Sequence, residues 1–101
     1  MEIGELETLC LNLADRLATV SLAEEMHALA GDLNWARTKV YIRKPAGRER
    51  LTQIEAAAQA LQAALGVEGA QGEGVQAAFD DLEDAVRRLR IEIARDTQTA
   101  T

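Results

Sequence analysis

Apolar residues recur at intervals of three and four along nearly the whole chain, and no other feature constrains the fold as strongly. In an α-helix this spacing places the residues on one face, so each series predicts an amphipathic helix with one buried stripe. The run Leu51, Ile54, Ala58, Leu61 and Leu65 is one of four such series. We therefore predict helices over about residues 2–19, 22–43, 48–65 and 75–95.

Residues that commonly begin or end helices lie near these boundaries. Ser21 followed by Glu24 predicts a capping box at the start of the second helix. Pro45 predicts the end of that helix, because the residue before a proline disfavours helical geometry. Gly66 follows the third series and predicts a left-handed C-cap. Residues 97–101 carry no apolar pattern and are predicted to form a disordered tail.

Short connections between the predicted helices favour antiparallel packing of neighbours. The predicted fold class is therefore all-α, a small antiparallel three- or four-helix bundle that forms a single domain over residues 1–96. One segment competes with this prediction, because Thr38, Val40 and Ile42 alternate with polar residues as in a β-strand. A lone strand would have no sheet to join, so a continued helix is the favoured interpretation.

Composition indicates the cellular compartment in which the chain is expected to occur. No stretch approaches the roughly 20 apolar residues that span a bilayer, so no membrane partner is predicted. The N-terminus is acidic and lacks the basic and apolar segments of a signal peptide. Cys10 is the only cysteine, which fits a reducing compartment. These features predict a cytoplasmic protein.

The residue types that support catalysis or metal binding are present but do not form a recognisable pattern. Nucleophilic catalysis needs a nucleophile, a base and an orienting group. Cys10 falls in the predicted buried stripe, Ser21 is expected to cap a helix, and His27 is the only histidine. Glu24 and His27 have the spacing of di-iron bundles, but no companion glutamate lies mid-stripe on another helix. We predict no enzyme activity, no metal site and no cofactor.

Positive charge is concentrated in one short segment of an acidic chain. The net charge is -6, yet residues 37–50 hold six of the eleven basic side chains. The first four basic residues of this segment complement the negative end of the second predicted helix dipole. Arg48 and Arg50 instead begin the third predicted helix, where positive charge is unfavourable. The segment is therefore a candidate patch for an acidic protein surface or for phosphate.

The second predicted helix has a further apolar face. Trp35 lies about 140° from the centre of its buried stripe, on the same side as Thr38 and Ile42. An exposed tryptophan is typical of a binding hot spot, whereas a helix packed from both sides is the alternative. The predicted partner-binding residues are Trp35, Thr38, Ile42, Tyr41, Arg37, Lys39, Arg43, Lys44, Arg48 and Arg50.

These features predict a non-enzymatic helical module that binds a larger protein or complex as an inhibitor, adaptor or assembly factor. Small acidic proteins of this kind include phage-encoded inhibitors of bacterial immune machinery, an association that rests on composition alone. One alternative is a nucleic-acid-binding regulator that uses residues 37–50, although an acidic chain repels a polyanion. Another is a homo-oligomeric structural subunit, in which the Trp35 face or the alanine-rich third helix forms a homodimer contact.

Overall fold

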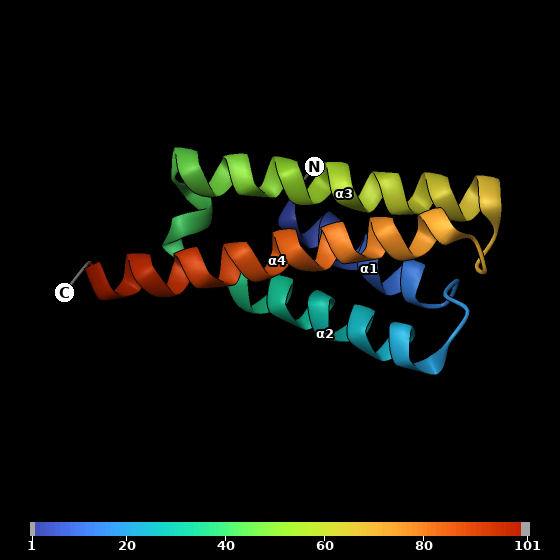
Figure 1. Cartoon of the computed structure of the whole chain (residues 1–101). Helices are drawn as coiled ribbons and strands as arrows, with labels where there is room; N and C mark the ends of the chain where they lie inside the picture. Colours follow the sequence, from blue (N-terminus) through green and yellow to red (C-terminus); the bar gives the residue numbers. More distant parts are fainter. Residues whose placement is uncertain (1, 100–101) are drawn as a thin grey trace.

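A computed structural model describes residues 2–99, the last two by their backbone alone. It contains four α-helices and one short 3₁₀ helix (Figure 1). The elements are α1 (Ile3–Ala14), α2 (Val20–Ala36), η1 (Val40–Arg43), α3 (Pro45–Glu68) and α4 (Glu73–Thr99). Within the described residues there is no β-strand, and the predicted all-α class is confirmed.

The helices form two antiparallel hairpins that pack on each other. One hairpin pairs α1 with α2 and the other pairs α3 with α4, while α1 also lies against α3 and α2 against α4 (Figure 1). The resulting four-helix bundle is elongated, measuring 46 × 22 × 19 Å. The 37–44 connection crosses one end of the bundle and brings η1 against α3.

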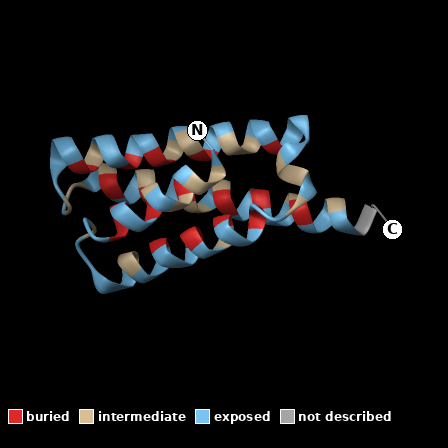
Figure 2. Ribbon diagram, turned by 180° about the vertical axis from the view of Figure 1, so that it is seen from behind, coloured by how far each residue is buried: buried red, intermediate tan, exposed pale blue. Residues whose placement is uncertain are grey.

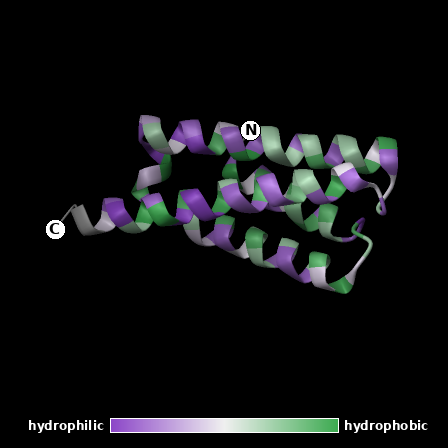
Figure 3. Ribbon diagram, in the orientation of Figure 1, coloured by the Kyte–Doolittle hydropathy of each residue, from purple (hydrophilic) through white to green (hydrophobic). Residues whose placement is uncertain are grey.

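All four helices contribute to one apolar core. Leu6, Leu33, Leu61 and Leu82, one from each helix, have no exposed surface, and Phe79 packs among them with 1% exposed. Burying a side chain of this size stabilises the fold by about 1.5–3 kcal/mol. Among the described residues no polar or charged side chain is buried. Buried residues accordingly face inward and hydrophilic residues outward (Figures 2 and 3).

The helix predicted over 22–43 is wrong at its C-terminal end, because α2 stops at Ala36. The hydroxyl of Thr38 donates to the carbonyl of Trp35 at 2.9 Å, and Lys39 then adopts an extended backbone. Pro45 does not end this helix but occupies the first position of α3, where its missing N–H leaves no hydrogen bond unmade. The alternation that resembled a strand coincides with this reversal and with η1.

The first helix, predicted over 2–19, ends instead at Ala14, because the N–H groups of Arg16 and Leu17 bond to carbonyls only three residues back. Other predicted boundaries change as well. Thr19, not Ser21, caps α2, since its hydroxyl accepts from the Leu22 N–H at 3.1 Å. The third helix runs through Gly66 and ends before Gly69, which has a φ of 78°. The predicted disordered tail overlaps α4, which continues to Thr99. Residues 100 and 101 of that tail lie outside the described residues.

Gly47 allows η1 to lie directly on the first turn of α3. A Cβ atom at this position would overlap the carbonyl oxygen of Tyr41 and would lie 2.9 Å from the Cα of Ile42. Both obstacles are backbone atoms, so a rotamer change cannot relieve the overlap. The 37–44 connection can therefore follow its observed path only if residue 47 is a glycine.

Replacing Gly47 by alanine should lower the free energy of unfolding by roughly 1–3 kcal/mol, the usual effect of overpacking. Gly31→Ala is a matched control, because apart from its chain neighbours and its own helix backbone no atom lies within 4 Å of the added Cβ. This second change should stabilise α2 by about 0.5–1 kcal/mol through helix propensity. Urea unfolding followed by circular dichroism measures both effects. A Gly47→Ala variant as stable as the original chain would contradict the close approach of η1.

Candidate functional site

The ten predicted partner-binding residues do not form one surface. Trp35, Thr38 and Lys39 lie at the C-terminal end of α2, which we call the Trp35 surface. A second group faces α4 and a third lines a groove beside α1. The second group is Tyr41, Lys44 and Arg50. The third group is Arg37, Ile42, Arg43 and Arg48.

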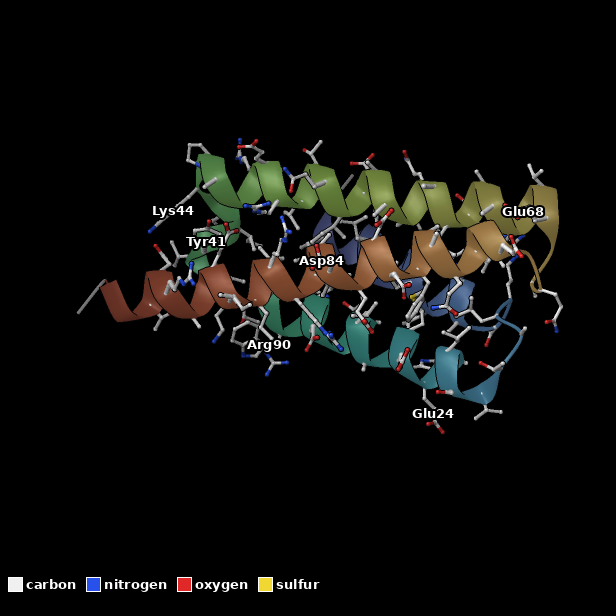
Figure 4. All side chains as sticks on the ribbon, in the orientation of Figure 1. Glu24, Tyr41, Lys44, Glu68, Asp84 and Arg90 are labelled. Atoms are coloured by element: carbon white, nitrogen blue, oxygen red, sulfur yellow. The ribbon has the colours of Figure 1, made fainter. Side chains whose placement is uncertain are left out.

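Trp35 lies outside the core, with 38% of its surface exposed. The Nζ of Lys39 lies 4.8 Å from the centroid of the indole, and the guanidinium carbon of Arg90 lies 5.4 Å from it. Both distances are within the range of cation–π attraction. Arg90 reaches the ring from α4 and also pairs with Asp32 on α2 (Figure 4). The ring is therefore held at the surface by two cations, neither enclosed by the core nor fully free.

The helix surface next to Trp35 carries small side chains. Ala28 and Gly31 precede Trp35 by seven and four residues, so they lie on the same face of α2. Both are exposed, and the space above Gly31 is open. The indole consequently lies beside a stretch of α2 where no long side chain covers the backbone.

The second group joins the start of α3 and η1 to the C-terminal part of α4. The Nζ of Lys44 lies 2.6 Å from a carboxylate oxygen of Asp96, and the Nε of Arg50 lies 2.8 Å from one of Glu92. Tyr41 also shares a side-chain hydrogen bond with Glu92. We call these five residues the α4 polar cluster (Figure 4). Its basic members are engaged within the chain.

Most of the concentrated positive charge is thus matched internally. Besides Lys44 and Arg50, Arg37 lies 3.7 Å from the carboxylate of Glu7 on α1, and Lys39 lies over Trp35. Of the six basic residues between 37 and 50, Arg43 and Arg48 alone make no ion pair or cation–π contact with a described residue.

Arg43 and Arg48 line an open groove between the N-terminal half of α1 and the η1–α3 junction, which we call the α1–η1 groove. Its volume is about 910 Å³. Its apolar lining comes from side chains that pack against the core: Ile3, Leu9, Ile42 and Leu51. Glu2 and Glu5 line the side formed by α1. Sequence reasoning missed this side, although Leu9 lies beside the main stripe of its helix and was an available signal.

The candidate catalytic residues are kept apart by burial. Cys10 has no exposed surface, whereas Ser21 and His27 are exposed on α2. Burial raises the pKa of the Cys10 thiol from 9.0 to about 11, and the charge of Glu7 adds to the shift. The thiol is consequently protonated at neutral pH and is a weak nucleophile.

The described residues offer neither a metal-ligand cluster nor a membrane-spanning helix. Residues 2–99 contain no group of three or more histidine, cysteine, aspartate or glutamate side chains that could hold a metal ion. Within the same part of the chain, every helix is too short or too polar to cross a membrane.

Comparison with known proteins adds no functional information. No protein-family model, curated protein or solved structure matches the chain. Function is therefore argued from the Trp35 surface and the α1–η1 groove.

The raised pKa of Cys10 predicts a loss of stability in alkaline solution. Well below pH 9 the thiol is protonated in both states, so it contributes no pH dependence there. Between pH 9 and 11 only the unfolded chain releases the proton. The free energy of unfolding should fall by up to about 1.4 kcal/mol per pH unit. Urea unfolding across this range should show a steeper loss than in Cys10→Ala, and equal slopes would contradict the assignment.

Tyr41 is the only tyrosine, so its ionisation can be followed directly by ultraviolet absorbance. Burial raises the pKa of Tyr41, and the charge and hydrogen bond of Glu92 raise it further. Glu92→Gln should lower this pKa because both contributions of the carboxylate are weakened. Glu83→Gln is the control, since Glu83 pairs with Arg87 elsewhere on α4. An unchanged midpoint in Glu92→Gln would refute the α4 polar cluster.

Proposed function

We propose that the chain is a non-enzymatic protein-binding module that acts by occupying a surface of a larger protein or complex, as an inhibitor, adaptor or assembly factor. The observation that carries this proposal is the exposed indole of Trp35, held in place by Lys39 and Arg90. Tryptophan is among the residues that dominate binding free energy at protein interfaces. The Trp35 surface is the proposed contact.

The surroundings of Trp35 favour this use. Because two cations already restrain the ring, little side-chain entropy remains to be lost when a partner binds. Because Ala28 and Gly31 have small side chains, the surface of α2 beside the indole leaves room for a partner's backbone. The core is complete without Trp35, since the buried leucines of α2 face the opposite way.

Binding of nucleic acid is less well supported. Affinity for a polyanion grows with the number of phosphates that basic side chains neutralise. Four of the six basic residues between 37 and 50 are already engaged within the chain. The two that are left face a groove whose other side carries Glu2 and Glu5, in a chain of net charge -6. A protein surface is the better match for this distribution of charge.

Trp35→Ala should weaken capture of the partner on the order of thirtyfold, because hot-spot truncations cost about 2 kcal/mol or more. The measurement is affinity capture from the native cell with the tagged full chain, followed by titration of the recovered partner. Val67→Ala is the matched control, because Val67 is 87% exposed near the far end of α3. Circular dichroism would verify that both variants are folded.

Equal recovery with Trp35→Ala and with the original chain would contradict the proposed contact. Light scattering over a range of protein concentrations tests the homo-oligomeric alternative. If the mass rises with concentration and Trp35→Ala abolishes the rise, the Trp35 surface binds a second copy and the proposal is overturned.

A further inference from the structure

We infer that the α1–η1 groove is a second binding site, which takes an acidic, partly apolar segment of a partner polypeptide. The inference rests on the proposed function only in that the ligand is a protein. It concerns a different surface, because the groove lies between α1 and the η1–α3 junction whereas Trp35 belongs to α2 and lies outside the core.

The first argument is the unmatched charge of two arginines. Carboxylates of this chain engage Arg37, Lys44 and Arg50, but no described residue pairs with Arg43 or Arg48. Both unmatched side chains are exposed and line the same groove. A guanidinium presents a planar set of donors that matches a carboxylate with two hydrogen bonds. The groove is therefore suited to a ligand with one or more carboxylates.

The second argument is the apolar lining and the size of the groove. Ile3, Leu9, Ile42 and Leu51 are partly buried side chains that pack on the core and also border the groove. A volume of about 910 Å³ is far more than a single small anion needs and lies at the upper end of ligand pockets. The ligand should accordingly bring apolar side chains next to its carboxylates.

The third argument concerns the negative charge on the other side. Glu2 and Glu5 border the groove from α1, opposite the arginines. A uniformly anionic ligand, such as a phosphodiester backbone, would be repelled by these two glutamates. A polypeptide can place a carboxylate near the arginines and an amide or basic group near α1. This mixed pattern of charge is the reason for choosing a peptide.

The side of the groove that carries the arginines is also held in place before binding. The close approach at Gly47 places η1 on α3, and the Lys44–Asp96 pair joins its end to α4. Ile42 and Arg43 belong to η1 and share this restraint. A preorganised surface loses less conformational entropy when a ligand binds.

The test uses short random peptides displayed on phage and selected on the immobilised full chain. Arg43→Glu/Arg48→Glu is the informative variant, and its fold should be intact because neither arginine forms an ion pair with a residue that the structure describes. Arg16→Glu/Arg87→Glu is the matched control, with the same change in net charge at exposed positions away from the groove. Selected peptides should combine aspartate or glutamate with large apolar residues.

Binding of a selected synthetic peptide should fall at least about tenfold in the groove variant and should persist in the control, as expected when charged pairs are removed from an interface. Amide chemical shifts should move at Ile3, Leu9, Ile42 and Leu51. Failure to select a peptide that depends on the two arginines would overturn the inference. So would a single-stranded oligonucleotide that binds the original chain and loses binding in the groove variant.

The same peptide should bind Trp35→Ala as tightly as the original chain. This arm separates the two proposals, because loss of partner capture in Trp35→Ala supports the Trp35 surface whether or not the groove binds peptides. Conversely, peptide binding at the groove together with unchanged capture by Trp35→Ala would support the groove alone. Loss of peptide binding in a folded Trp35→Ala would overturn the assignment of the peptide to the groove.

Discussion

The contact between Gly47 and the backbone of η1 determines how the two helical hairpins are joined. Because the Tyr41 carbonyl lies directly on the first turn of α3, the 37–44 connection can cross the end of the bundle at close range. Ile42 then packs against the core while Arg43 remains exposed. This contact sets the place where α3 begins. The alignment of the second hairpin, α3 and α4, with the first therefore depends on it, as does the apolar core that the two hairpins share.

The helices and their buried stripes could be predicted because periodicity is a local property of the sequence. Leu61 and Leu82, for example, have no exposed surface, as the spacing of apolar residues indicated. The end of α2 could not be predicted in the same way. Val40 continues the stripe in phase, yet it is 67% exposed on η1. Its apparent place in the pattern is a coincidence of spacing, and the course of the chain there depends on contacts with α3.

The candidate site was predicted less completely, for a related reason. The outward position of Trp35 follows from a helical wheel, and the ring is indeed outside the core. The partners of the basic residues could not be inferred, since Arg50 and Glu92 are 42 residues apart and Lys44 and Asp96 are 52 apart. Arg50 seemed misplaced at the start of a helix only because Glu92 was not known to lie beside it. The groove likewise exists only once α1 and α3 are placed relative to each other.

The elongated shape of the bundle separates Arg43 and Arg48 from acidic side chains at the opposite end. The unmatched arginines lie toward the η1 end, whereas Glu24 and Glu68 lie at the other, and the long axis measures 46 Å (Figure 4). At physiological ionic strength charges are screened over about 8 Å, so an approaching molecule responds more strongly to the nearer end than to the distant one. For an acidic partner, added salt should therefore slow diffusional encounter at the arginine end and speed encounter at the opposite end.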